Sequence, residues 1–335
     1  MADDTRAPRI ALAEIAALAE VSEATVSRVM NRRYGVAPAT REAVERAMAS
    51  LGYERRINGQ LVVLLTPSLT NPFFARLGDR IQSELAPYGL RTLICPVDAG
   101  TADEREYVTL LAEAGIAAAV FMSSSNTVRS SDRSPAEVLA ARGVPFVSIN
   151  GNFDGIVAPT LSTNEGMAAQ LSVDHLASLG HRRIGMAAGP VGNIPADRRV
   201  DGFVRAMEAI GAEDADVVRQ FYSIEGGRHA AEQLLEQGVT AIIAGSDEMA
   251  LGVLQAADRA GLSVPGDLSL VGYDDNPVLD FTDPPVSTIR PPIDRIAEQT
   301  ARSIVAMISG RPVSTTEMFF DPELHLRRST GPARS

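Results

Sequence analysis

Cysteine, lysine and tryptophan are almost or wholly missing from this sequence of 335 residues. The single cysteine, Cys95, cannot form an internal disulfide, which favours a reducing compartment and predicts a cytoplasmic protein. No apolar run approaches the roughly 20 residues that are needed to span a bilayer. The acidic start Met1-Ala2-Asp3-Asp4 also lacks the pattern of a secretory signal, so we expect no membrane partner.

The missing lysines leave arginine as the only basic residue besides histidine, and its distribution is uneven. Residues 1–60 hold nine arginines against eight acidic residues, a net charge of +1, whereas the remaining 22 arginines and 34 acids give −12. The N-terminal segment is therefore the part of the chain that DNA does not strongly repel, although the whole protein carries −11. The length suits two or three domains rather than one.

Three short segments with helical apolar spacing lie between residues 10 and 51. Their apolar positions are Leu12, Ile15, Ala16 and Ala19, then Val26, Val29 and Met30, and finally Val44, Ala47, Met48 and Leu51. Between the first two segments, Glu20-Val21-Ser22 is a short turn in which Ser22 can cap the second helix. Two short helices joined in this way are typical of a helix-turn-helix.

After Tyr53 strands and helices alternate, which predicts parallel sheets with helices on both faces. Strands are expected at 61–65, 92–97, 117–122, 144–149, 184–188, 219–222, 241–244 and 268–271. Helices are expected at 73–86, 167–179, 201–210, 227–236 and 247–259. These strands are too many for one compact sheet, so we expect two lobes, with a border near 158–164 and a return crossing near 284–292. In such sheets ligands bind beyond the carboxyl ends of the strands.

Several motifs occur in a fixed order along nearly the whole chain. They are Glu20-Val21-Ser22-Glu23-Ala24-Thr25-Val26-Ser27-Arg28-Val29-Met30-Asn31, Asn71-Pro72-Phe73-Phe74, Gly180-His181-Arg182-Arg183-Ile184, Ser246-Asp247-Glu248-Met249-Ala250, Val264-Pro265-Gly266-Asp267 and Val271-Gly272-Tyr273-Asp274-Asp275. With these motifs the sequence resembles the lactose-repressor/galactose-repressor family of bacterial transcriptional regulators. The resemblance implies an α/β protein with an N-terminal three-helix helix-turn-helix head and a two-lobed receptor that is like a periplasmic binding protein and has parallel sheets.

The expected domains are a DNA-binding head over 8–53, a short linker over 54–60 and an effector-binding and dimerisation domain over 61–335. Within the latter we expect lobe 1 at about 61–158 and 286–310, and lobe 2 at about 162–284 and 311–330. The resemblance implies a repressor that binds palindromic operator DNA as a homodimer. Whether the effector acts as inducer or corepressor stays open.

The second helix of the head is the expected recognition helix, because this motif inserts the first turn of that helix into the major groove. Glu23, Ala24 and Arg28 would face the bases, and Arg28 can bond a guanine in two places. Short polar side chains suit contacts with phosphates. The expected DNA-binding residues are Ser22, Glu23, Ala24, Thr25, Ser27, Arg28, Asn31 and Tyr53.

Three features of the head depart from the family pattern. Glu20 replaces the usual turn glycine, which is unfavourable if that position has a positive φ. Ala11 and Ala37 replace the usual Ser or Thr caps, at about 1 kcal/mol each. The linker contains Asn58-Gly59 and is too short for the family's hinge helix, so we expect that helix to be absent or rudimentary.

The resemblance also implies a small-molecule effector site between the lobes. Its expected residues are Phe73, Phe74, Asn150, Arg199, Tyr222, Ser246 and Asp274. Asp247 is expected only to cap the helix that follows it, Asp275 to orient its loop, and Arg198 to lie at the surface. An arginine and an aspartate with aromatic rings suit a sugar or related polyol, and they also suit a nucleobase.

Other function classes have little support. The sequence lacks a Gly-x-Gly-x-x-Gly, a Walker loop and a His-Glu-x-x-His motif, and its four histidines are scattered. We therefore expect no enzyme activity, no cofactor and no metal site. Two alternatives stay open, namely a regulator that answers to a nucleobase and a ligand receptor with weakened DNA binding.

Overall fold

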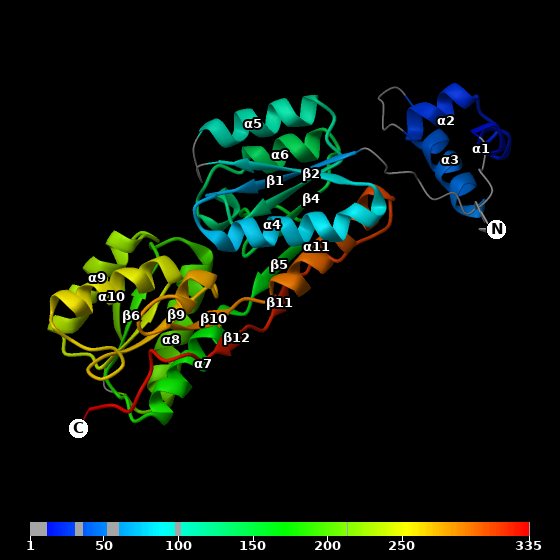
Figure 1. Ribbon diagram of the computed structural model, residues 1–335. Helices are drawn as coiled ribbons and strands as arrows, with labels where there is room; N and C mark the ends of the chain where they lie inside the picture. The colour runs from blue at the N-terminus through cyan, green and yellow to red at the C-terminus, as the bar shows by residue number, and fades with distance from the viewer. Residues whose placement is uncertain (1–11, 31–35, 52–59, 98–101, 213, 335) are drawn as a thin grey trace, which may run out of the picture. The chain divides into compact units, whose positions relative to one another are not determined.

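The computed structural model describes residues 12–30, 36–51, 60–97, 102–212 and 214–334 (Figure 1). The chain divides into a small unit, Met1–Asn58 with Ser309–Arg311, and a large unit, Gly59–Ile308 with Pro312–Ser335. We call them the head and the receptor. Each is described by itself.

The head consists of α1 (Leu12–Leu18), α2 (Glu23–Met30) and α3 (Pro38–Ser50). Their apolar faces form one small core of Ile15, Ala16, Ala19, Val26, Val29, Val44 and Ala47. The helical spacing of the sequence predicted all of these positions, and they are buried as expected. The predicted Met30, Met48 and Leu51 are partly buried against the core, and Leu12 stays 38% exposed. The three-helix head is therefore confirmed.

The turn between α1 and α2 follows the expectations for Ser22 and Glu20. The backbone N–H of Thr25 donates to the Ser22 Oγ at 3.1 Å, which confirms the cap. Glu20 has a φ of 52°, in the left-handed region where side chains with a Cβ are strained. At the start of α3, Ala37 makes no side-chain cap, because a methyl group cannot accept a hydrogen bond.

Glu20→Gly should raise the free energy of unfolding of the head by about 1 kcal/mol, because glycine adopts a positive φ without steric strain. Hydrogen exchange of the amides of α1 and α2 measures the change. Glu14→Gly is the matched control, because the same substitution at an exposed helical position with no positive φ, in the first turn of α1, should destabilise the head, by up to about 1 kcal/mol. Equal effects of the two variants would contradict the role of the positive φ.

The receptor contains two six-stranded sheets. The first has the order β11-β5-β4-β3-β1-β2 and is parallel throughout. Its strands are β1 (Leu61–Thr66), β2 (Arg91–Pro96), β3 (Ala118–Met122), β4 (Phe146–Ile149), β5 (Thr160–Thr163) and β11 (Met318–Phe320). The central strands are continuous buried apolar runs, as expected for a parallel sheet covered on both faces.

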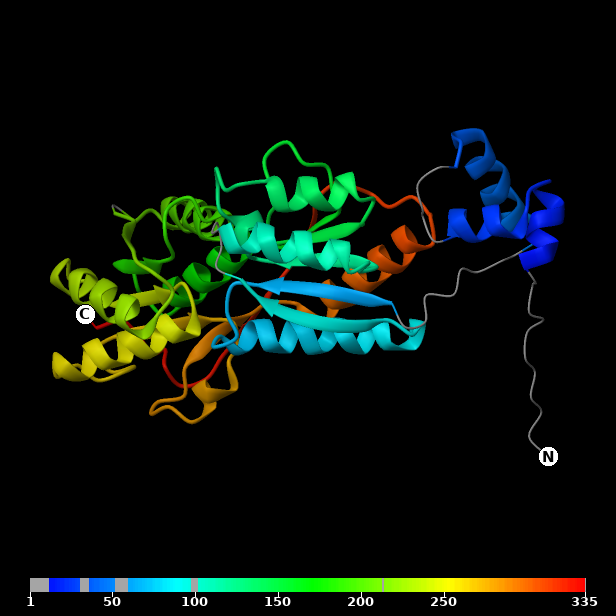
Figure 2. The same ribbon diagram turned by 90° about the horizontal axis from the view of Figure 1, so that it is seen from above.

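Four α-helices cover the first sheet in two pairs (Figures 1 and 2). The pair α4 (Pro72–Leu85) and α11 (Ile293–Ile308) lies on one face, and the pair α5 (Ala102–Glu113) and α6 (Ser134–Ala141) lies on the other. Short 3-10 helices, η1 (Ala86–Tyr88) and η2 (Ser125–Thr127), complete the connections.

The second sheet has the order β12-β10-β9-β8-β6-β7, and only the β10–β12 pair is antiparallel. Its strands are β6 (Ile184–Ala188), β7 (Asp216–Arg219), β8 (Ala241–Ala244), β9 (Ser269–Tyr273), β10 (Ser287–Arg290) and β12 (Glu323–His325). The covering helices are α7 (Glu165–Ser178), α8 (Ile194–Ala209), α9 (Ile224–Glu236) and α10 (Asp247–Arg259), with the 3-10 helix η3 (Pro277–Asp280) after β9. Helices α7 and α8 form one pair and α9 and α10 the other.

The chain crosses between the sheets three times, after β5, after β10 and after β11. Two predicted lobe boundaries are therefore wrong. Residues 287–290 were expected in lobe 1 but pair with β9 in the second sheet, and residues 318–320 were expected in lobe 2 but pair with β5 in the first. The cause is that these strands have three or four residues and were not recognised as strands in the sequence.

Two predicted elements near the site also need correction. Helix α8 begins at Ile194 rather than at 201, because Pro195 lies in the first turn, where proline is tolerated. Strand β7 ends at Arg219, so Tyr222 lies in the loop beyond it. None of the described helices has the length and apolarity that a membrane crossing requires.

Candidate functional site

The exposed face of α2 carries the residues expected to read DNA. Glu23, Ala24 and Arg28 are exposed, whereas Val26 and Val29 on the opposite face are buried in the head's core. Ser22 and Thr25 bond one another through their hydroxyls at 2.9 Å at the start of the helix. Ser27 is partly buried.

Some head and linker predictions cannot be followed in the structure. Asn31, Tyr53, Ala11 and the linker from 54 to 59 lie outside the described residues. Their assignments stay predictions from the sequence.

Three predicted effector residues, Arg199, Tyr222 and Asp274, lie in one cluster of lobe 2. Arg199 contacts the Gly245 carbonyl and the Tyr273 ring, the Tyr222 ring lies beside Gly245, and Asp274 directly follows Tyr273. Asp274 follows β9 directly and has a φ of 116°, which turns the chain sharply at the carboxyl end of the strand. Only 8% of the residue is exposed. Burial raises the pKa of the Asp274 carboxyl to about 7, and the hydrogen bond from Asn71 opposes the shift only in part.

Arg199 projects from the second turn of α8 and is 6% exposed. Its Nε donates to Glu165 Oε2 at 2.7 Å and its Nη1 donates to the Gly245 carbonyl at 2.5 Å. The guanidinium carbon lies 3.4 Å from the centre of the Tyr273 ring. Burial works to lower the pKa of Arg199, but the nearby Glu165 keeps it above its ordinary value, so the side chain is a fixed cation.

Tyr222 packs its ring against backbone. A Cβ on Gly189 would come within 2.2 Å of the Tyr222 ring, and one on Gly245 within 3.3 Å. Glycine at the ends of β6 and β8 therefore makes room for the ring. Burial raises the pKa of Tyr222 to about 12, so it is a neutral hydrogen-bond donor.

Ser246, and not Asp247, caps the helix that follows them. Ser246 is the N-cap of α10, with its Oγ accepting from the Met249 N–H at 3.2 Å. Asp247 is 1% exposed and accepts from the Asn276 N–H at 2.6 Å and from the Thr288 hydroxyl at 2.8 Å. The prediction that Asp247 caps the helix is therefore wrong.

Asp275 orients its loop, as expected. Its carboxylate bonds Arg290 at 2.6 Å, Arg327 at 2.9 Å and His325 at 3.0 Å. Burial works to raise the pKa of Asp275, and these partners hold it below its ordinary value. Arg198, beside Arg199, forms a two-bond ion pair with Glu317 at 2.6 and 2.9 Å.

The residues predicted in lobe 1 are engaged within that lobe. Phe73 is 6% exposed and meets Phe74 edge to face, with ring centres 5.2 Å apart. Asn150 has a φ of 64°, accepts from the Thr163 N–H at 3.0 Å and donates to the Ser123 hydroxyl at 3.1 Å. Within the described part of the chain, no hydrogen bond or ring contact joins Phe73, Phe74 or Asn150 to Arg199 or Asp274.

Direct contacts connect the two lobes, and one of them is made at Asp274 itself. Asn71 caps α4 and also donates through its Nδ2 to Asp274 at 3.1 Å. At a second point the Arg129 N–H donates to the Gly192 carbonyl at 2.7 Å, and the Arg129 side chain lies 3.4 Å from Asp197. The hydrogen bond at Asp274 therefore depends on how the two lobes are placed against each other.

Sequence reasoning missed Glu165, Tyr273 and Asn71 as members of the cluster. Asn71 was part of a recognised motif just after β1, and that position beyond a strand end was a usable signal. Glu165 follows β5, which has the polar sequence Thr-Leu-Ser-Thr and was not recognised as a strand. Tyr273 is the last residue of β9, and only the fold brings its hydroxyl to Glu165, at 2.9 Å.

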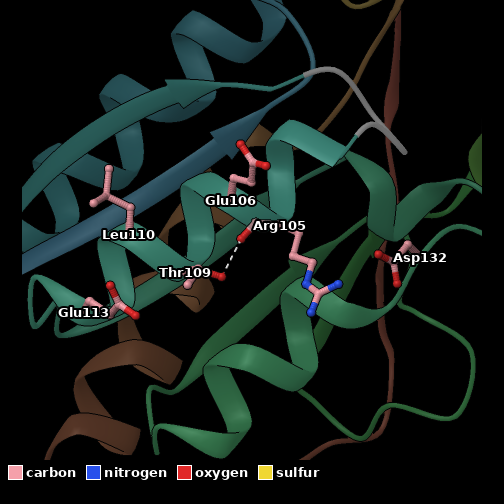
Figure 3. Close-up of a pocket in the computed structure, with 6 residues that line it drawn as sticks. All are labelled: Arg105, Glu106, Thr109, Leu110, Glu113 and Asp132. Carbon is pink, nitrogen blue, oxygen red and sulfur yellow. Dashed lines mark hydrogen bonds between the residues drawn. The ribbon is translucent and has the colours of Figure 1, made fainter.

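Two hollows of the receptor surface lie elsewhere. One of about 450 Å³ runs along α5 and is lined by Arg105, Glu106, Thr109, Leu110, Glu113 and Asp132 (Figure 3). Another, of about 530 Å³, lies between the middle of α4, the first turn of α11 and the crossing segments after β10 and β11. Neither is lined by a predicted effector residue, so neither enters the assignment of the effector site.

Comparison with known proteins identifies both parts of the chain. Residues 11–56 match the family described as "Bacterial regulatory proteins, lacI family", and residues 173–330 match the "Periplasmic binding protein-like domain". The chain is 43% identical over 329 residues to the "Uncharacterized HTH-type transcriptional regulator in aml 5'region" of Streptomyces limosus, covering 95% of this chain and 94% of the relative.

Solved structures of transcriptional regulators are similar to this chain over nearly its whole length. The "transcriptional regulator CelR-cellobiose complex" is similar with a TM-score of 0.73 and 29% identity, over 96% of this chain and 100% of the other. The "lac repressor dimer bound to operator and the anti-inducer ONPF" is similar with a TM-score of 0.71 and 25% identity, over 97% and 100%. The predicted fold class and resemblance are confirmed, and the chain belongs to the lacI family of bacterial transcriptional regulators.

Proposed function

We propose that this protein is a homodimeric repressor whose two heads bind a palindromic operator, and that a sugar bound at the cluster around Arg199 and Asp274 controls its affinity for DNA. The observation that carries the proposal is the convergence of a buried cation, a buried carboxyl and a neutral tyrosine at the strand ends of lobe 2. A fixed guanidinium donates to sugar oxygens, a carboxylate accepts from sugar hydroxyls, and a tyrosine ring stacks on the apolar face of a pyranose.

The similarity to a cellobiose complex of a family member supports a sugar as effector. The similarity to a repressor dimer bound to operator supports dimerisation. Light scattering should therefore give a mass of about twice 35.5 kDa.

The contacts between the lobes suggest how a ligand would act. Asp274 is bonded by Asn71 of lobe 1, so a ligand hydroxyl that engages Asp274 competes with this bond or reinforces it. Either event changes the relative stability of the arrangements of the two lobes. In a dimer that change alters the spacing of the heads, which must match half-sites about one helical turn apart.

The test is a thermal-shift screen of the full-length protein with neutral mono- and disaccharides, polyols and nucleobases, followed by calorimetry. A neutral sugar should raise the melting temperature and change the affinity for operator DNA. Stabilisation by nucleobases and by no sugar would replace the sugar by the alternative effector class. A receptor whose ligand leaves DNA binding unchanged would overturn the coupling.

The affinity for a neutral sugar should rise two- to tenfold between pH 6 and pH 8. The reason is that Asp274 has a pKa near 7 in the free protein, and its carboxylate is the better acceptor for hydroxyls. Calorimetry across this range measures the change. Asp274→Asn should bind more weakly and show a flat profile, whereas a wild-type profile that is already flat would exclude Asp274 from the contact.

A further inference from the structure

Glu165 lies at the first position of α7, directly after the crossing from the first sheet, and is 3% exposed. One carboxylate oxygen accepts from Arg199 at 2.7 Å and the other from the Tyr273 hydroxyl at 2.9 Å. Neither the sequence motifs nor the family resemblance assigned it a role.

Close packing of two helices brings Glu165 to Arg199. A Cβ on Gly202, one turn after Arg199 in α8, would lie 2.7 Å from the Cα of Gly166 in α7. Two glycines therefore allow the helix backbones to approach at this level. The ion pair is a consequence of the α7–α8 contact and not of chance rotamers.

The ion pair fixes the direction of the guanidinium, and the Glu165 carboxylate balances its positive charge. Glu165 accepts the hydrogen bond of Nε–H, the Gly245 carbonyl accepts that of one Nη1–H, and the Tyr273 ring covers one face. No other hydrogen bond to Arg199 occurs in the described part of the chain, so three of its five N–H groups stay available to a ligand.

The surrounding charges make the cluster poor in free positive charge. Arg219, the other cation that acts on Tyr222, is bonded to Asp197 at 2.9 Å and to the Gly189 carbonyl at 3.2 Å. Asp274 and Asp247 are two further carboxyl groups, both buried. Among the described residues, the two cations that act on Tyr222, Arg199 and Arg219, are each paired with a carboxylate, so an anionic ligand there would lose its hydration without gaining a free counter-charge.

We propose that Glu165 is a positioning residue that holds Arg199 and cancels its charge, so that the site accepts uncharged polyhydroxylated ligands and rejects phosphorylated or carboxylated ones. This rests on the proposed function, since the site is taken to be the effector site. Arg199 then serves as an oriented set of hydrogen-bond donors and not as an anion-binding charge.

The first experiment needs no variant. Calorimetry compares each neutral sugar with its charged counterparts, for example glucose with glucuronate and glucose 6-phosphate, and ribose with ribose 5-phosphate. The wild-type protein should bind the preferred neutral sugar at least 30-fold more tightly than its anionic counterparts. Equal or tighter binding of an anionic counterpart would overturn the proposal.

The second experiment uses inorganic phosphate as the probe and does not depend on a sugar. Glu165→Gln leaves Arg199 without its counter-charge, so 20 mM phosphate should raise the melting temperature of the variant by about 2 °C or more and leave that of the wild type unchanged. The same variant should lose at least tenfold of its preference for neutral over anionic sugars, and Glu165→Asp should restore most of that preference.

Glu317→Gln is the matched control, because it removes the carboxylate that pairs with Arg198, the neighbouring arginine. It should keep the wild-type ratio of affinities and show no response to phosphate. Failure of every sugar to bind, together with a phosphate response confined to Glu165→Gln, would reject the sugar effector and support the role of Glu165. A phosphate response in wild type, or its absence in a folded Glu165→Gln, would reject that role.

Discussion

Arg199→Ala should abolish the response to effector, with a loss of at least 100-fold in affinity for the sugar, while the protein still binds its operator. The variant removes three free N–H donors that are charged and already oriented by Glu165 and Gly245. Hydrogen bonds to charged groups contribute about 1.5–3 kcal/mol each, so two lost bonds suffice for this effect. Calorimetry measures the affinity, and fluorescence anisotropy with labelled operator measures release.

The variant also leaves the buried Glu165 carboxylate unpaired, which destabilises a protein by about 3–5 kcal/mol. Arg199→Ala combined with Glu165→Gln avoids this and should show the same loss of response in a more stable protein. Arg198→Ala is the control, since that neighbouring arginine pairs with Glu317 instead. Retention of wild-type sugar affinity by the double variant would exclude Arg199 from the effector site.

Arg28→Ala should weaken operator binding by about 1–3 kcal/mol in each half-site, and it should relax the preference at one base pair. Arg28 is exposed in the last turn of α2, on the side opposite Val26 and Val29. A guanidinium there can donate two bonds to a guanine, and alanine can donate none. The measurement uses operators that are selected from random duplexes by the wild-type protein and then varied one base pair at a time.

Arg46→Ala separates base reading from general attraction to DNA. Arg46 is exposed on α3 and carries the same charge, so its loss should weaken binding to all sequences by a similar factor. The sequence preference of this variant should stay that of the wild type. A loss of preference in Arg46→Ala and not in Arg28→Ala would show that another helix reads the bases.

Both predictions rest on features that were visible in the sequence to different degrees. The three helices of the head could be predicted from the sequence, because they bury apolar residues at helical spacing and because Ser22 caps the second helix. The family's glycine at position 20 also indicated a positive φ there, and Glu20 has one. These are local relations, which periodicity and capping rules describe.

In the receptor, the strands that are apolar runs could be predicted from the sequence. Strands β6 and β8 and helix α10 have the predicted bounds. The edge and crossing strands were missed, because segments of three or four residues such as β5 and β11 become strands only through their neighbours in the sheet. Two lobe boundaries were wrong for that reason.

The sequence by itself determined the family, the two-part architecture and the candidates Arg199, Tyr222 and Asp274, because these depend on ordered motifs and on positions just beyond strand ends. Only the tertiary structure decided that Glu165 and Tyr273 hold Arg199 and that Asn71 reaches Asp274. Those partners are 34, 108 and 203 residues apart in the pairs Glu165–Arg199, Glu165–Tyr273 and Asn71–Asp274. No local pattern encodes such contacts, since they arise from helix packing at glycines and from the apposition of two lobes.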